Sequence, residues 1–493
     1  MTIRKRFVSL CLAAFLCAAA SGSALAAEKT PEIKSSPLAA GFLHSAVVQD
    51  DGTLLTAGSN AYGQLGVILP DAEELDSSAE ESFSPEEEEN SDHTVESSPI
   101  EEETTSLRGS STKFVQVMSD VQAVYAGYLN TFAIDASGIL YGWGWNEGGQ
   151  LGVGDAENRT IPAEVLTQVV FVAPGRFHTA AVSEDGTLWL WGWNNRGQLG
   201  LGSTNDLNTP KEVLDNVRTA AVGIEHTMAV KEDNTLWAAG GNDYGQLADG
   251  GREGTLTFRQ VMEDVQDVAC TAFGTVILKT DGTVWVCGYN ASGELGNGGT
   301  QNLDEPLQIL SDVEKIACGE DFSAAILKDG TLYAWGSNSF GQYGTETSAK
   351  PVQVAEHVTD AALGGGHMLY LTEDGMVYAL GNNEQGQLGN GTLNAHTEPA
   401  SVAENVAPTP KKASNTPVIV LVVVLILAVL AVFGVLIART LKGKPDKAKA
   451  KKPQPKKEKK PEGATPKPAK SEKKQKPEID VEALEDEITK EDE

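Results

Sequence analysis

The sequence predicts an all-β fold, a seven-bladed β-propeller of four-stranded blades, followed by one transmembrane helix and a disordered tail. Three observations lead to this prediction. Two short phrases recur seven times in one register, each copy alternates apolar and polar residues as strands do, and a long apolar run follows the last copy. A repeat of roughly 40 to 50 residues in which every copy is all-β is typical of a propeller blade and not of a helical solenoid.

The two phrases keep the same spacing throughout the chain. The first is Gly-x-x-His-Thr followed by Asp-Gly-Thr-Leu-Trp, and the second is Trp-Gly-x-Asn-x-x-Gly-Gln-Leu-Gly. The first phrase starts at Gly41, Gly127, Gly175, Gly223, Thr271 (in place of glycine), Gly319 and Gly364. The opening glycines of Gly-Gln-Leu-Gly are Gly63, Gly149, Gly197, Gly245, Gly293, Gly341 and Gly386. Both series show one step of 86 residues, four of 48 and one of 45, which indicates seven copies of one unit.

Each copy predicts four strands. In the fourth copy, apolar residues alternate through 226–231 and again through 235–239, which predicts two strands. The polar pair Asp233-Asn234 between them predicts a hairpin with a type I′ turn, whose two central residues both need positive φ. We expect a third strand before the histidine, at 218–222, and a fourth near 258–261.

The two ends of the repeat region predict how the ring closes. The last copy ends at 398–406, where other copies continue into the next inner strand. Residues 33–40 supply a strand of that kind at the start of the chain. We therefore expect the two termini to join in one blade.

The two phrases resemble the repeats of the regulator of chromosome condensation family, and the resemblance covers roughly residues 33–406. It implies a seven-bladed propeller that holds a protein on one face of the ring. Related propellers include a nucleotide-exchange factor for a small GTPase, a secreted inhibitor of β-lactamase and a plant UV-B photoreceptor. Three copies depart from the pattern, with Asn130, Gly274 and Phe322 in place of the histidine, so the resemblance implies no shared reactive histidine.

Composition shifts divide the chain into segments. We predict a signal peptide at 1–26, a propeller at 27–407, a linker at 408–416, a transmembrane helix at 417–438 and a disordered Lys/Pro-rich tail at 439–493. The signal has a basic start, an apolar run and the small-residue site Ala24-Leu25-Ala26. The apolar run that follows the propeller is long enough to span a ~30 Å hydrocarbon core as a helix.

The charges around the apolar run predict the orientation of the chain. Basic residues follow it at once, from Arg439 onward, and such residues favour the cytoplasmic side. We expect the propeller outside a cell membrane crossed once, and the tail inside. The short signal and the few cysteines indicate a bacterial cell surface.

The predicted propeller is strongly acidic. The formal net charge of the chain is −31, and residues 28–410 carry 56 Asp and Glu against 16 Lys and Arg. Such a surface repels nucleic acid, so we expect none to bind the propeller. Residues 67–112 hold much of this charge and predict a disordered insertion in the first copy, which serves either as a solvated loop or as an arm for a partner or for cations.

No pattern of residues predicts catalysis, a cofactor or a metal. His44, His178, His226 and His367 share one repeat position, where a structural hydrogen bond is the favoured role over metal binding. The glycine runs lack the strand-to-helix setting of a phosphate loop, and no nucleophile elbow occurs. Cys270 and Cys318 share another position, and small core residues are favoured there over a disulfide. The sequence therefore predicts a protein that is not an enzyme.

Aromatic residues at a variable position are the candidate binding residues. Two tryptophan columns, represented by Trp191 and Trp189, recur in several copies and predict core packing between blades. By contrast, Trp145, Trp193 and Tyr289 occupy the variable x of Trp-Gly-x-Asn. Aromatics on neighbouring loops grip a sugar ring or a partner side chain, although local packing is the competing interpretation.

The sequence thus predicts an extracellular, membrane-anchored propeller that binds an unidentified protein or glycan. The alternative is a tethered inhibitor of an extracellular enzyme, similar to the β-lactamase-inhibitory propeller. Binding loops vary without leaving a motif, so the sequence does not identify the ligand.

Overall fold

A computed structural model of the chain describes residues 36–69, 109–344 and 347–407. The predicted signal, transmembrane helix and tail, and most of the predicted linker and insertion, lie outside the described residues. Within the described ranges, no helix is both long enough and apolar enough to cross a membrane. All of these residues belong to the first of two compact units, Met1–Ala413.

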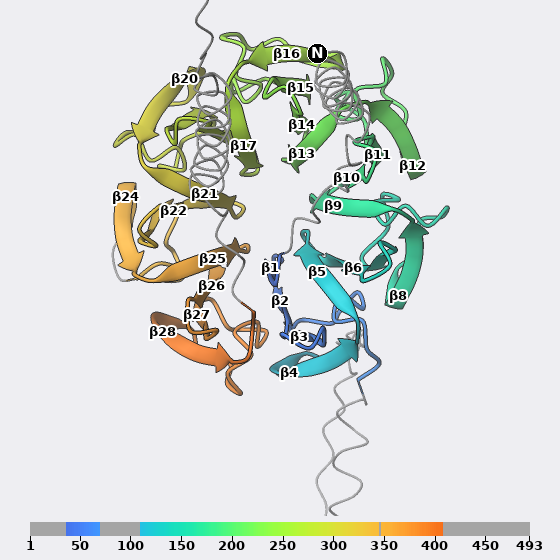
Figure 1. The fold of residues 1–493 in the computed structure, drawn as a ribbon, viewed down its shortest axis with the longest axis vertical. Helices are drawn as coiled ribbons and strands as arrows, with labels where there is room; N and C mark the ends of the chain where they lie inside the picture. The colour runs from blue at the N-terminus through green and yellow to red at the C-terminus, as the bar shows by residue number, and fades with distance from the viewer. Residues whose placement is uncertain (1–35, 70–108, 345–346, 408–493) are drawn as a thin grey trace, which may run out of the picture. The chain divides into compact units, whose positions relative to one another are not determined.

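Seven four-stranded antiparallel sheets form a ring around a central channel, and each sheet is one blade (Figure 1). The strands of a blade follow one another in the sequence, from the channel outward, and the blades are numbered 1 to 7 in chain order. The prediction of a seven-bladed propeller is confirmed.

The bounds of the strands repeat from blade to blade. The inner strands are β1 (Leu38–Ala40), β5 (Val121–Ala126), β9 (Val169–Pro174), β13 (Val217–Val222), β17 (Val265–Cys270), β21 (Val313–Cys318) and β25 (Val358–Leu363). The second strands are β2 (His44–Val48), β6 (Asn130–Asp135), β10 (His178–Ser183), β14 (His226–Lys231), β18 (Gly274–Lys279), β22 (Phe322–Leu327) and β26 (His367–Thr372). The third strands are β3 (Leu54–Gly58), β7 (Leu140–Gly144), β11 (Leu188–Gly192), β15 (Leu236–Gly240), β19 (Val284–Gly288), β23 (Leu332–Gly336) and β27 (Val377–Gly381). The outer strands are β4 (Ser111–Met118), β8 (Arg159–Leu166), β12 (Leu207–Leu214), β16 (Thr255–Met262), β20 (Leu303–Leu310), β24 (Ser348–Ala355) and β28 (His396–Ala403).

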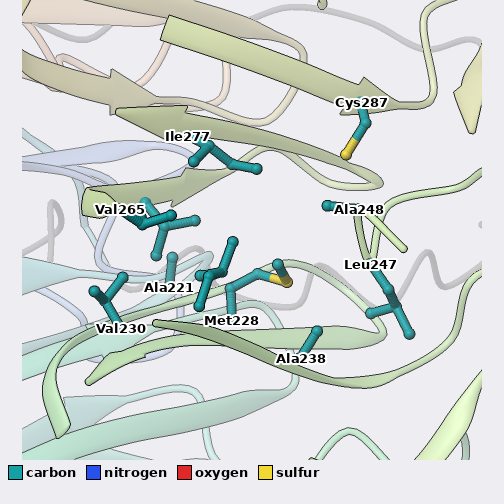
Figure 2. Packing of buried hydrophobic residues seen from close by; sticks show 11 residues of the cluster. Ala221, Met228, Val230, Ala238, Leu247, Ala248, Val265, Ile277 and Cys287 are labelled. Atoms are coloured by element: carbon teal, nitrogen blue, oxygen red, sulfur yellow. The ribbon is translucent and has the colours of Figure 1, made fainter. Parts of the chain in front are cut away.

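The core lies between blades, because each sheet packs both of its faces against its neighbours. In one cluster, Met228 and Leu247 of blade 4 meet Val265 and Ile277 of blade 5, and all four are fully buried (Figure 2). The predicted core column of Trp143, Trp191 and Trp335 is also fully buried. The second tryptophan column, Trp189, Trp237 and Trp285, is only half-buried. Trp189 and Trp285 nevertheless pack against core clusters between blades, so the prediction of core packing is confirmed for these two.

The hairpins of the blades are present, but their turn type differs from the prediction. Between β14 and β15, the Asn234 amide donates to the Lys231 carbonyl over 3.0 Å, and only Asn234 has positive φ, at 66°. This is a three-residue loop with one left-handed residue, and not a type I′ turn. Asp233 stabilises the loop through its side chain, because its Oδ1 accepts a hydrogen bond from the Thr235 amide at 3.0 Å.

The two ends of the ring meet through backbone hydrogen bonds. Each blade is complete without a strand from the other terminus, yet the Asn405 carbonyl accepts the Asp50 amide at 2.8 Å. At the entrance to blade 2, the Asp120 carbonyl accepts the Ala136 amide in the same way. The residues after β28 therefore occupy the entrance to blade 1. The two termini meet at this blade, as expected, but they do so through hydrogen bonds and not by sharing a sheet.

Two further predictions need adjustment. Strand β4 begins at Ser111, inside the insertion that was predicted to end at residue 112. The three cysteines of the described residues are reduced, as expected, but only Cys287 belongs to the core. Cys270 and Cys318 are half-buried and line the channel.

Candidate functional site

Two sets of variable loops open at the same end of the ring, which we call the loop face. One set joins inner strands to second strands and carries the two variable positions of Gly-x-x-His, as in 175–177. The other set joins third strands to outer strands and begins at the variable x of Trp-Gly-x-Asn, as in 193–206. Because the strands of a blade alternate in direction, both sets lie at one end and the hairpins lie at the other.

The channel narrows at the loop face. Inner strands of all seven blades line a cavity of about 550 Å³, and the Gly-x-x-His loops surround a smaller mouth of about 130 Å³. Backbone hydrogen bonds link neighbouring loops, for example from the Phe42 amide to the Tyr128 carbonyl at 2.8 Å. The mouth is therefore a fixed ring from which variable side chains project.

The column histidines connect neighbouring blades. His44 Nε2 lies 2.8 Å from Thr131 Oγ1 of blade 2, and that hydroxyl donates to the Gln64 carbonyl at 2.8 Å. Since the hydroxyl proton is used, the histidine donates from Nε2 and is neutral. The same contact with the next blade is made by His178, His226 and His367.

Burial lowers the pKa of these histidines far below their usual range. The pKa falls to about 3 for His44 and His178, and to about 4 for His226 and His367. Among the described residues, no group of three or more His, Cys, Asp and Glu side chains is placed to hold a metal ion. A structural hydrogen bond is present at this position, but it joins neighbouring blades, whereas we expected it to pin the turn.

Aromatic side chains of blades 1 to 3 form a continuous band on the loop face. Phe177 stacks on Trp193 with ring centroids 4.3 Å apart and meets Trp145 edge-on at 5.8 Å. Tyr128 stacks on Phe42 at 4.3 Å and lies 6.5 Å from Trp145. Trp193 is 38 % exposed. We refer to Phe42, Tyr62, Tyr128, Trp145, Phe177 and Trp193 as the aromatic arc.

Arg176 joins the aromatic arc to the acidic side of the mouth. Its guanidinium carbon lies 4.1 Å from the ring centroid of Tyr128 and 5.1 Å from that of Phe177. Its Nη1 lies 3.4 Å from Glu320 Oε1 in blade 6. Burial raises the pKa of Glu320 and nearby Asp321 adds to this, whereas the Arg176 charge opposes it. A cation stacked on two rings thus borders a half-buried carboxylate.

The structure brings two of the three predicted binding residues together. Trp145 and Trp193 both contact Phe177, so they belong to one surface. Tyr289 lies in a second group, where it meets Tyr244 edge-on at 5.1 Å. Whether these residues bind a ligand stays a prediction.

Sequence reasoning missed the residues between the glycine and the histidine of each copy. These two positions change character from blade to blade, and the first of them reads Phe42, Tyr128, Arg176, Ile224, Ala272, Glu320 and Gly365. Variation at a fixed structural position was the available signal, because a purely structural position would keep one residue type.

Comparison with known proteins identifies the repeat. The family described as "Regulator of chromosome condensation (RCC1) repeat" matches residues 137–182, 185–230, 281–326, 329–371 and 374–419. A second description of the same repeat matches 121–150, 169–198, 217–246, 265–294, 313–342 and 358–387. The chain belongs to the RCC1 repeat family. The matched residues lie in blades 2 to 7, and neither description matches the strands of blade 1.

Individual relatives of this RCC1-repeat chain agree on the fold. The Ultraviolet-B receptor UVR8 of Arabidopsis thaliana is 33% identical over 132 residues, which are 27% of this chain and 22% of the receptor. Yeast RCC1 (Prp20), solved with bound Kap60, is 18% identical with a TM-score of 0.58 over 77% of this chain and 86% of that one. Human WBSCR16 is 23% identical with a TM-score of 0.53, and the match covers 68% of this chain and 86% of that one.

Proposed function

We propose that this RCC1-repeat propeller is a platform that binds a partner protein on its loop face, without catalysis. The observation that carries the proposal is the aromatic arc, which gathers six rings from three blades beside the channel mouth. Trp193 is 38 % exposed and the other five rings are partly exposed, and a contiguous apolar patch of this kind marks an interaction site. Tryptophan, tyrosine and arginine are also the residues that most often dominate the energy of protein interfaces.

Relatives with the same fold support a binding role. Prp20p of Saccharomyces cerevisiae is 21% identical, with a TM-score of 0.52 over 58% of this chain and 77% of that one, and its solved structure is described with its binding properties to Gsp1p and histones. RCC1-repeat propellers typically serve as platforms for proteins. The strong negative charge of this chain argues for a partner other than nucleic acid.

Capture from a cell extract tests the proposal. The full-length chain in a non-ionic detergent is compared with the double variant Trp145→Ala/Trp193→Ala and with the control Glu184→Ala, an exposed residue of the hairpins at the opposite end. We expect the wild type and the control to retain one protein in equal amounts. The double variant should capture at least tenfold less of it. Equal capture by all three, or capture of glycans alone, would contradict the proposal.

We also propose that the propeller lies outside the cell, on a membrane that residues 417–438 cross. The signal-like start of the chain, the apolar run and the basic residues after it support this orientation. Ser110→Cys places an exposed thiol at the edge of blade 1, whereas burial raises the pKa of the native Cys270, Cys287 and Cys318 and lowers their reactivity. A membrane-impermeant maleimide should label the variant in intact cells, and labelling only after lysis would contradict the proposed orientation.

A further inference from the structure

A cavity of about 290 Å³ opens on the loop face beside the aromatic arc, between blades 4, 5 and 6. One wall is aromatic. Tyr244 meets Phe273 at 5.3 Å and Tyr289 at 5.1 Å, and both contacts are edge-on. Phe273 and Tyr289 lie 6.4 Å apart, so the three rings form one compact wall.

The facing wall is acidic. It consists of Glu294 of blade 5 and of Glu320 and Asp321 of blade 6. Arg176 also lines the cavity, but it pairs with Glu320 and stacks on Tyr128. One cation therefore faces three carboxylates, and that cation is already engaged.

Glu294 departs from the repeat in a way that packing does not require. The other six copies have glutamine at this position, namely Gln64, Gln150, Gln198, Gln246, Gln342 and Gln387. The structural duty of the position is to accept a backbone amide two residues earlier, as Gln246 Oε1 does from Tyr244 at 3.0 Å. Glu294 Oε2 does the same from Ser292 at 2.8 Å. Glutamine would satisfy that bond equally well.

The second oxygen of Glu294 is the unusual feature. It replaces an amide nitrogen, so an acceptor stands where the other copies have a donor. The residue is 2 % exposed, and the groups that hydrogen-bond its carboxylate are Ser292 and the backbone amide of Glu294 itself. Burial raises the pKa of Glu294 and the charge of Asp321 adds to this. A desolvated carboxylate beside a second negative charge is costly, and a cation bound in the cavity would offset that cost.

The shape and charge of the cavity limit the chemical class of ligand that it can bind. A bare metal ion is disfavoured, because the described carboxylates are not grouped to hold one. An anion is excluded by the carboxylates themselves. A cationic head on an apolar stem fits both walls, because an aromatic wall attracts a cation and packs against methylene groups.

We propose that this cavity binds the basic side chain of the partner protein, with the ammonium or guanidinium group donating to Glu294 and facing Asp321. The stem lies along Phe273 and Tyr289. The inference rests on the proposed function, because it assigns chemistry to a partner on the same loop face. It also gives Tyr289 a role distinct from that of the tryptophans in the aromatic arc.

Saturation-transfer NMR on the full-length chain in a non-ionic detergent tests the inference. The probes are Nα-acetyl-lysine methylamide, Nα-acetyl-arginine methylamide and, as a neutral control, the lysine probe acetylated on its side chain. Glu294→Gln restores the residue of the other six copies and keeps the Ser292 bond. Glu253→Gln makes the same chemical change at an exposed carboxylate outside the cavity. Thermal unfolding of both variants confirms that they fold.

We expect saturation transfer to the side-chain methylenes of at least one basic probe, and much less to the neutral probe. Glu294→Gln should weaken binding at least fivefold, and Glu253→Gln should leave it unchanged. Absent transfer to both basic probes, equal binding of the neutral probe, or wild-type affinity in Glu294→Gln would overturn the inference.

The outcomes separate this inference from the function on which it rests. A partner whose capture requires Trp145 and Trp193 but is unaffected by Glu294→Gln would retain the proposed function and overturn the inference. Probe binding that depends on Glu294, with no protein captured, would overturn the proposed function alone.

Discussion

Arg176 of blade 3 reaches across the channel mouth to Glu320 of blade 6, with Nη1 and Oε1 3.4 Å apart. The two residues occupy the same repeat position three blades apart, and they divide the loop face into two parts. On one side Arg176 stacks on the aromatic arc, and on the other Glu320 borders the acidic cavity. The ion pair is half-exposed, so its direct contribution to folding is small.

Removal of the arginine should therefore change the site more than the fold. Arg176→Met keeps apolar contact with Tyr128 but removes the charge that lowers the pKa of Glu320. We expect a loss of less than about 1 kcal/mol in the free energy of unfolding. In carboxyl-carbon NMR, Glu320 should titrate at higher pH than in the wild type. Arg196→Met, which removes the partner of Asp243, is the control and should leave Glu320 unchanged.

Two tryptophans that lie two residues apart, Trp191 in β11 and Trp193 in the loop after it, should differ in their response to truncation. Trp191 is fully buried and its Nε1 donates to the Gln150 carbonyl at 2.8 Å, whereas Trp193 is 38 % exposed. Trp191→Ala should cost ~3–5 kcal/mol of stability, because it leaves a cavity and removes one of the two hydrogen bonds to the Gln150 carbonyl. Trp193→Ala should cost less than about 1 kcal/mol and weaken partner capture. Urea unfolding measures both, and similar losses would contradict the assignment of Trp193 to a binding surface.

The column histidines should make stability depend on pH. Unfolded His226 takes up a proton below pH 6.5, but the folded protein keeps it neutral down to about pH 4. The wild type therefore loses stability as the pH falls through this window. His226→Phe follows the natural Phe322 of blade 6 and removes the titrating group.

At pH 7.5 the phenylalanine variant should be less stable by ~1 kcal/mol or more, since the bond to Thr275 is lost. Between pH 7.5 and pH 5 the wild type should lose about 2 kcal/mol of stability relative to the variant. Urea unfolding at both pH values measures the difference in stability between the variant and the wild type. A difference that stays constant would show that His226 is protonated in the folded state.

The column glycine of blade 4 should be required because a histidine follows it. A Cβ at Gly223 would overlap the ring of His226, although the backbone there has no positive φ. We expect Gly223→Ala to cost ~2–3 kcal/mol. Blade 5 contains the natural compensation, with Thr271 before Gly274, so adding His226→Gly should recover part of the loss. Gly299→Ala, in open surroundings, is the neutral control, and all three are compared by thermal unfolding.

The blades were predictable because seven copies repeat one pattern of alternating residues, and a strand error in one copy is corrected by the other six. The turn type was not predictable from Asp233-Asn234, because aspartate was chosen for its side-chain bond to Thr235 and not for positive φ. The depth of the Trp237 column was not predictable, because repetition indicates a shared role but does not say how fully a side chain is covered.

The candidate site was predictable in part. Trp145 and Trp193 stood out because their position varies, but Phe177, which connects them, lies in another loop of the repeat. The Arg176–Glu320 pair depends on the width of the ring, which no local pattern encodes. Opposite charges at one repeat position were nevertheless visible, so a comparison of variable positions around the ring would have found it.

The most direct test of the proposed binding surface is photocrosslinking in cells. A benzoylphenylalanine is placed at position 193, in the aromatic arc, or at position 184, on the hairpins at the opposite end. We predict a single protein adduct after irradiation from position 193 and none from position 184. An adduct from position 184 alone would contradict the assignment of the loop face as the binding surface.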